Sequence, residues 1–177
     1  VGVASLMTLA RFSEGFLLLR AQSVGLEEML VPLVFIVMNL VYAGCAYPVG
    51  TLSDRLGRRG LLLTGFTVLI VADVVLANAG TIFGVIGGVA LWGLHMGMTQ
   101  GLLAAMVAEH APADQRGTAF GVFNLVSGVA ALLASVIAGA LWSAIGPQAT
   151  FWAGAGFTAC AILALVFRRG ETLLNRP

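Results

Sequence analysis

Six long apolar runs are the feature that most constrains what this sequence can fold into. They cover approximately residues 1–19, 29–52, 60–79, 81–108, 117–141 and 148–167. A helix needs about 20 mostly apolar residues to span a bilayer, and none of the runs shows the alternation of a barrel strand. Only 10% of the 177 residues are charged, whereas a soluble domain carries about 25%. We therefore expect an all-α integral membrane protein whose residues 1–177 form one bundle of six transmembrane helices.

The arginines predict an orientation for this bundle. With six spans, the second and fourth connections and the C-terminal tail share one side of the membrane. That side carries seven arginines: Arg55, Arg58, Arg59, Arg116, Arg168, Arg169 and Arg176. The opposite side carries Arg20, and Arg11 lies inside the first run. Because cytoplasmic loops are enriched in basic residues, we expect the seven-arginine side to face the cytoplasm, in a bacterial inner (plasma) membrane.

The second connection, GTLSDRLGRRG (50–60), has a fixed pattern as well as a concentration of charge. Its fixed positions are Gly50, Asp54, Arg55, Gly57, Arg58 and Arg59. This G-x-x-x-D-R-x-G-R-R pattern resembles the signature loop between the second and third helices of the major facilitator superfamily, which recurs less strictly between helices eight and nine.

Two further segments resemble the same family. LARFSEGFLLLRAQSVGL (9–26) is similar to helix seven of bacterial members, and PADQRGTAFG (112–121) resembles the cytoplasmic connection that opens the fifth helix of a six-helix repeat. The resemblance implies a two-bundle fold of which this chain is the half containing helices 7–12. The N-terminal six-helix half would be a missing partner, and a chain that opens inside an apolar run without Met is expected to be a piece of something longer.

The chemistry of the loop residues agrees with this interpretation. Gly50 would let two helices approach closely, and Gly57 would allow a positive φ in a tight loop. Asp54 can accept bonds from N–H groups at a helix N-terminus, and the forked guanidinium of Arg58 suits a carboxylate partner. In the family, this loop is a latch that closes the cytoplasmic side and opens as the two bundles rock.

The resemblance also implies a partner for Arg58 at the acidic end of the fourth run. Glu109 is the carboxylate there, with Asp114 and Arg116 close by in the sequence. We expect an Arg58–Glu109 ion pair at the cytoplasmic rim. The alternative is two independent solvated charges, since exposed pairs contribute only about 0–1 kcal/mol.

Arg11 and Glu14 are charges at membrane depth in the first run. An i, i+3 spacing places both on one face of a continuous helix, and intramembrane charge is costly, which favours a functional role. The resemblance implies that helix seven lines a central cavity, so we expect these residues to contact substrate or a coupling proton. The alternative is a self-neutralising pair that eases insertion.

Other polar residues at membrane depth are candidates for the substrate or proton pathway. They are Asn39, Tyr42, His95, Thr99 and Asn124. For each of them, an interhelical or local hydrogen bond is the competing interpretation. Gly93, Gly97 and Gly101 form a small-residue ridge for helix packing, and Asp73 is expected to face protein rather than lipid.

The function that these observations favour is secondary active transport of a small organic solute by alternating access, with a coupling proton or other ion as a further partner. The alternative is a six-helix half-transporter or scaffold that works only when paired with another chain. The residues for an intramembrane protease or a water channel are absent, and a net charge of +1 gives no general attraction to nucleic acid. Cys45 and Cys160 suit neither a disulfide framework nor a zinc site, so no enzyme activity, metal or cofactor is expected.

Overall fold

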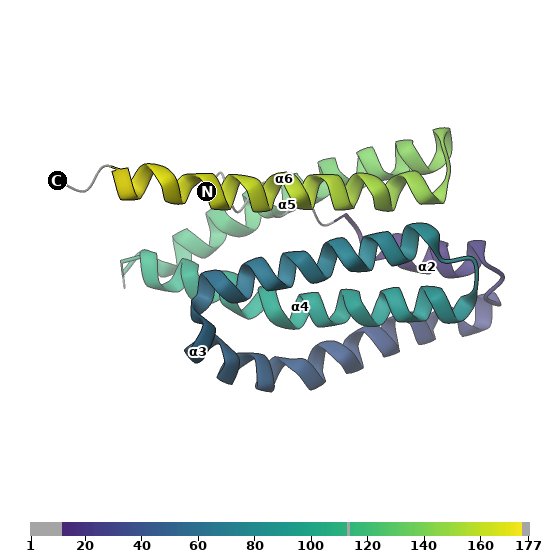
Figure 1. Ribbon diagram of the computed structural model, residues 1–177, viewed down its shortest axis with the longest axis horizontal. Coiled ribbons are helices and arrows are strands. Elements are labelled where there is room, and N and C mark those ends of the chain that lie inside the picture. The colour runs from purple at the N-terminus through teal and green to yellow at the C-terminus, as the bar shows by residue number, and fades with distance from the viewer. Residues whose placement is uncertain (1–11, 113, 175–177) are drawn as a thin grey trace.

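The computed structural model describes the backbone of residues 12–112 and 114–174, and their side chains except at 53–56, 58, 106, 110 and 167–174. All regular elements in this part of the chain are helical. They are α2 (Gly15–Ser23), the 3-10 helix η1 (Glu28–Leu30), α3 (Pro32–Asn78), α4 (Ile82–His110), α5 (Arg116–Ala144) and α6 (Pro147–Leu174). Figure 1 shows them as a bundle of long, roughly aligned helices.

Five segments of the described chain are long and apolar enough to cross a membrane. They are Glu28–Leu52, Arg59–Asn78, Ile82–Glu109, Arg116–Ala144 and Pro147–Val166. Five of the six predicted runs therefore correspond to candidate spans. The first two lie within the single helix α3, which is broken at Gly57 by a non-helical φ of 71° and ψ of 152°.

The first predicted run differs from the structure where the two can be compared. Residues 1–11, including Arg11, lie outside the described residues. Phe12 and Ser13 are not helical, so the continuous helix expected over 1–19 is not found. The Ser13 hydroxyl accepts a bond from the N–H of Gly15 (3.2 Å), and the Ser13 N–H donates to the hydroxyl of Ser135 on α5 (3.1 Å). A short polar side chain that bonds the backbone in this way competes with the helix, so α2 begins only at Gly15.

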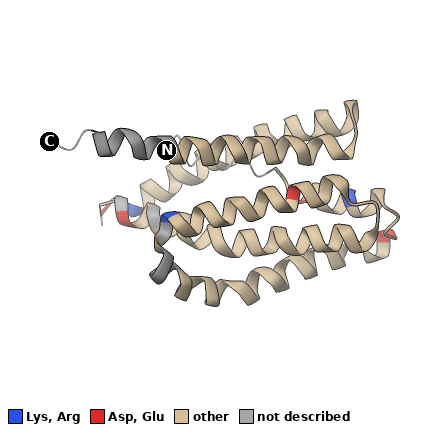
Figure 2. Cartoon of the chain, in the orientation of Figure 1, with Lys and Arg blue, Asp and Glu red and all other residues tan. Residues whose placement is uncertain are grey.

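The connections lie at two ends of the bundle. Figure 1 shows the bend within α3, the α4–α5 connection and the C-terminal end of α6 at one end. The turns after α3 and after α5 lie at the other end. In Figure 2 the coloured charges of the described residues gather mainly towards these ends. The two arginine-bearing connections that the sequence assigned to one side of the membrane therefore do lie together.

The two halves of α3 pack against different sides of α4. A Cβ on Gly65 would lie 2.6 Å from Thr99 Cγ2, and one on Gly88 would lie 2.6 Å from Leu76 Cγ. On its other side, α4 presents Gly93 to the carbonyl oxygen of Met38, while an added Cβ on Gly97 would lie 3.3 Å from the carbonyl of Tyr42. The predicted ridge is thus confirmed at Gly93 and Gly97. At Gly101 no close contact is found within the described residues, since none of their atoms lies within 4 Å of an added Cβ there.

Arg20 fastens α2 to the C-terminal end of α3. Its side chain is 5% exposed. Nε donates to the carbonyl of Leu76 (2.8 Å), and Nη2 donates to those of Ala77 (3.3 Å) and Ala79 (2.8 Å). The last carbonyls of a helix have no partner within the helix and carry partial negative charge, so one buried guanidinium satisfies several of them.

We expect Arg20→Gln to lower the stability of the intact protein by about 1.5–3 kcal/mol, the range for hydrogen bonds to charged groups. Thermal unfolding of the purified protein in detergent measures this change. Gln22→Ala is the matched control on the same helix, because Gln22 is exposed and its loss should leave the unfolding temperature nearly unchanged. Equal losses in the two variants would contradict the capping role of Arg20.

Candidate functional site

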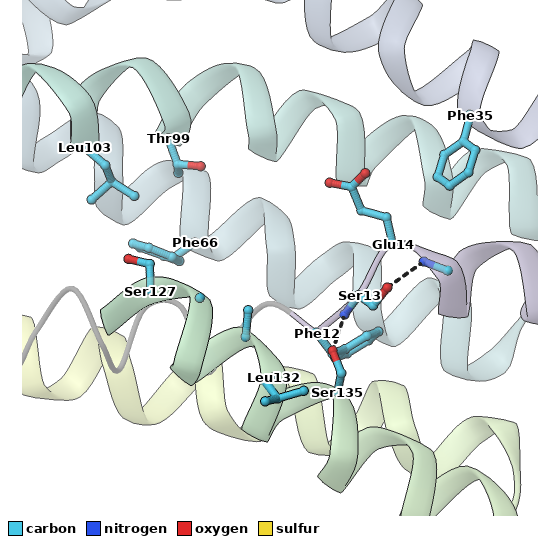
Figure 3. Close-up of a pocket in the computed structure, with 13 residues that line it drawn as sticks. Phe12, Ser13, Glu14, Phe35, Phe66, Thr99, Leu103, Ser127, Leu132 and Ser135 are labelled. Atoms are coloured by element: carbon cyan, nitrogen blue, oxygen red, sulfur yellow. Dashed lines mark hydrogen bonds between the residues drawn. The ribbon is translucent and has the colours of Figure 1, made fainter. Parts of the chain in front are cut away.

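A cavity of about 790 Å³ lies between the non-helical segment before α2 (residues 12–14), both halves of α3, α4 and α5. This volume is within the range of about 300–1,000 Å³ that is typical of small-molecule sites. Figure 3 shows the residues that line it. They are Phe12, Ser13, Glu14, Gly15, Phe35, Phe66, Thr99, Leu103, Ser127, Gly128, Ala131, Leu132 and Ser135.

The cavity wall combines aromatic rings with a few polar groups. Phe12, Phe35 and Phe66 supply apolar surface, and serine hydroxyls come from the segment before α2 and from α5. Glu14 carries the only formal charge among the described lining residues. An apolar pocket with few, well-placed polar groups suits a small amphiphilic molecule.

The break before α2 is what builds one side of this cavity. The Ser13 N–H is held by Ser135 on α5 (Figure 3), and α2 begins at Gly15, directly after Glu14. Phe12, Ser13 and Glu14 therefore reach the cavity as consecutive residues of a turn, which one face of a continuous helix would not allow. The sequence pattern predicted Ser135 as a packing position on the fifth run but did not point to Phe12 or Ser13. Serine is one of the residues preferred just before a helix begins, and that signal could have identified Ser13.

The structure places two of the predicted pathway residues at the cavity, Glu14 and Thr99. Thr99 is 1% exposed, and its hydroxyl donates to the carbonyl of His95 within α4 (2.9 Å). Arg11 lies outside the described residues. Arg11 and Glu14 could share a helix face only on a continuous helix, and the non-helical Phe12 and Ser13 remove that basis.

His95 is fully buried and does not line the cavity. Its Nδ1 lies 2.9 Å from the carbonyl of Gly65 on α3, and its ring packs 5.7 Å from that of Phe66. Because the partner is a carbonyl, Nδ1 carries the hydrogen. This contact joins α3 to α4. The position of His95 therefore agrees with the alternative interpretation, a hydrogen bond between helices.

The other predicted pathway residues are not among those that line this cavity. Asn39 is exposed and its Nδ2 donates to the carbonyl of Phe35, one turn earlier in α3 (2.8 Å). Tyr42 is half-buried against the hydrophobic core, and Asn124 is exposed on α5. The periodicity of the sequence shows which residues share one face of a helix, but it does not show which other helix packs against that face. The roles of Asn39, Tyr42 and Asn124 in transport stay predictions.

The bend in α3 matches part of the predicted latch. The positive φ expected at Gly57 is confirmed. The close approach expected at Gly50 is not found within the described residues, since an added Cβ there meets nothing within 4 Å. The side chains of Asp54, Arg55 and Arg58 lie outside the described ones, so the Arg58–Glu109 pair stays a prediction.

Arg59 makes a contact that the sequence did not predict. Its Nη2 donates to the carbonyl of Leu165, which ties the bend in α3 to the C-terminal part of α6. Glu109 and Arg116 are exposed at the termini of α4 and α5 that meet at the same end of the bundle (Figure 2). The described charged residues of this end therefore come from two connections that are distant in the sequence, the bend in α3 and the α4–α5 connection.

We expect Gly57→Ala to destabilise the intact protein by about 1–3 kcal/mol, because its φ and ψ lie in a region that is essentially restricted to glycine. Thermal unfolding measures the effect. Gly87→Ala is the control, since Gly87 is helical within α4 and has open space around it. A loss for Gly87→Ala as large as that for Gly57→Ala would show that backbone conformation is not the cause.

Comparison with known proteins gives a consistent family match. The family model described as Major Facilitator Superfamily matches residues 2–177. An uncharacterized MFS-type transporter of Methanocaldococcus jannaschii is 34% identical over 171 residues, which cover 93% of this chain and 43% of that protein. The inner membrane transport protein YajR of Escherichia coli is 28% identical over 72% of this chain and 28% of its own length.

An MFS-type efflux pump of Pseudozyma antarctica is 28% identical over 66% of this chain and 21% of its own length. The chain therefore spans less than half the length of these relatives.

Proposed function

The chain belongs to the major facilitator superfamily, and on that premise we propose that it is the C-terminal six-helix half of a secondary transporter for a small organic solute. As part of an MFS-type transporter, it is a membrane protein and not an enzyme. The solute would bind in the cavity between the segment before α2, α3, α4 and α5, and would be carried across the membrane by alternating access. The observation that carries this proposal is the cavity itself, whose wall is aromatic with one carboxylate and several hydroxyls.

The assignment to the C-terminal half rests on the motif at 50–60 and on the segments at 9–26 and 112–121. The orientation rests on the arginines, because the bend at Gly57 and the α4–α5 connection lie at one end of the bundle. We propose that this end faces the cytoplasm. There the residues of the motif, together with Glu109 and Arg116, would form the latch that closes when the outer side opens.

A partner bundle is supported by the uneven burial of the helices. Only 11% of the apolar window in Glu28–Leu52 and 17% of that in Arg116–Ala144 is buried within this chain, against 50% for Arg59–Asn78. Gly50, Gly117 and Gly121 have no atom within 4 Å of an added Cβ, and small residues permit close helix contacts in membranes. We propose that these two helices face the N-terminal half, and that the close approach predicted at Gly50 is made with that half.

The alternative is that two copies of this chain pair through the same faces as a half-transporter or scaffold. The exposed faces of α3 and α5 would serve a second copy as well as they serve an N-terminal half. Chemical cross-linking of the intact protein in its native membrane distinguishes the two arrangements, because only the alternative gives a covalent homodimer through α5.

Alternating access can be tested without knowing the solute. In the full-length carrier, with Cys45 and Cys160 replaced by Ala, Ser127→Cys places a thiol in the cavity wall. We expect a membrane-impermeant maleimide to label it from either side of the membrane, because the cavity would open to each side in turn. Labelling is measured in right-side-out and inside-out vesicles.

Two further positions act as controls for orientation. Gln115→Cys lies in the α4–α5 connection and should be labelled from the cytoplasmic side only. Ser143→Cys lies near the end of α5 at the opposite end of the bundle and should be labelled from outside only. Labelling of Ser127→Cys from one side alone would contradict alternating access, and reversed labelling of the controls would overturn the orientation.

A further inference from the structure

Asp73 is a buried acid that the proposed function does not use. It lies in the second half of α3, within the candidate span Arg59–Asn78, and is 0% exposed. Neither carboxylate oxygen has a hydrogen-bond partner among the described residues. The indole Nε1 of Trp92, on the adjacent helix α4, is likewise buried without a partner. Buried polar groups are nearly always hydrogen-bonded, so these two exceptions require an explanation.

A glycine on α6 makes the room for this carboxylate. A Cβ added to Gly154 would lie 2.8 Å from Asp73 Oδ2 and also 2.8 Å from Cε1 of Phe12. The carboxylate and the edge of the Phe12 ring therefore meet at the same small face of α6. Phe12 also packs against Trp92, with ring centroids 5.4 Å apart, and against Phe151 at 5.5 Å.

The same Phe12 ring borders the solute cavity. Phe12 is therefore shared by the solute cavity and by the buried site around Asp73. It also belongs to the non-helical segment before α2, which α5 holds through the Ser13–Ser135 bond. A rearrangement of that segment would move the ring and bring cavity water towards Asp73.

No described cation neutralises Asp73. On α4, the titratable residue is His95. Its ring is bound to the carbonyl of Gly65, which lies two turns before Asp73 on α3. On α6, residues 147–166 contain no acid, arginine or histidine, and Cys160 is exposed. From the segment before α2 and α2 itself, Glu14 lines the cavity and Arg20 binds the carbonyls at the end of α3.

The chemistry of an isolated buried carboxyl group makes its protonation depend on conformation. A charge buried without a partner is very costly, and binding a proton removes the charge. Contact with water removes most of the penalty, so the O–H bond can break and the proton can pass to a cavity water, leaving a carboxylate. Ionisable residues at membrane depth commonly take part in ion pathways for this reason.

We propose that Asp73 is a proton-binding site that exchanges with the solute cavity under the control of Phe12. The proposal rests on the proposed transport function and names its coupling ion. In the arrangement described here, the Phe12 ring adjoins the carboxyl group and the acid holds its proton. When the segment before α2 rearranges and cavity water reaches the acid, the acid releases the proton to that water.

Infrared difference spectroscopy of the full-length carrier in lipid nanodiscs tests this assignment directly. Spectra taken between about pH 5 and about pH 9, a range that brackets perturbed carboxyl groups, should contain a protonated carboxylic acid band that is lost in Asp73→Asn. The matched control is Asp114→Asn, which removes an exposed carboxylate and should keep the band. Identical difference spectra for the wild type and Asp73→Asn would overturn the proposal.

Two further variants keep the test decisive if Asp73→Asn does not fold. Gly154→Ala adds a methyl group against Oδ2 and should shift the frequency of the band. Phe12→Leu should accelerate its exchange in D₂O several-fold, because the ring no longer shields the acid. If neither variant changes the band or its exchange, Asp73 is not a site gated by Phe12, and a static water bound between Asp73 and Trp92 would account for the geometry.

The spectroscopic test requires no solute and no transport. Two-sided labelling of Ser127→Cys together with a silent Asp73 would leave the transport function standing and remove only the proton site. If Ser127→Cys is labelled from one side only and Asp73 still titrates, the proton-binding site stands and alternating access is contradicted.

Discussion

The lack of hydrogen-bonding solvent in hydrocarbon is the constraint on which this structure depends. Every backbone group at membrane depth must be satisfied by the protein itself, so each departure from a helix has to be supported. At Phe12 and Ser13 the support comes from two serine hydroxyls, one local and one on α5. At the end of α3 it comes from the buried guanidinium of Arg20. These supported interruptions are also where the helices meet the cavity and the turns.

Close packing through glycine determines how the helices are arranged around α4. Gly65 and Gly88 let α4 contact the second half of α3, and Gly93 and Gly97 let it contact the first half. Without a hydrophobic driving force between helices in lipid, van der Waals contact of this kind is a main source of association. Little of the first half of α3 and of α5 is buried by the described residues, which leaves their outward faces available to another bundle.

Much of the fold could be predicted from the sequence, because length and hydropathy are local properties. Five of the apolar runs correspond to candidate spans, and the glycine requirement at Gly57 followed from the loop pattern. The break before α2 could not be found in this way, since the Ser13 bond that stabilises it reaches a residue 122 positions away. The same limit applies to the site. His95 was recognised as unusual, but its partner Gly65 and its position behind Phe66 in the cavity wall depend on which face of α4 meets α3.

The two attachments of the cavity wall differ greatly in strength. On one side, Arg20 donates hydrogen bonds to three carbonyls at the end of α3 and so holds α2 against it. On the other side, α5 holds the neighbouring turn through the Ser13 N–H, and few of its own residues are buried. Moving α5 away from the segment before α2 would break the Ser13–Ser135 hydrogen bond and separate the Phe16 and Trp142 rings, whereas the contacts of Arg20 would stay in place. Enlargement of the binding chamber between α5 and this segment would require no helix to unwind.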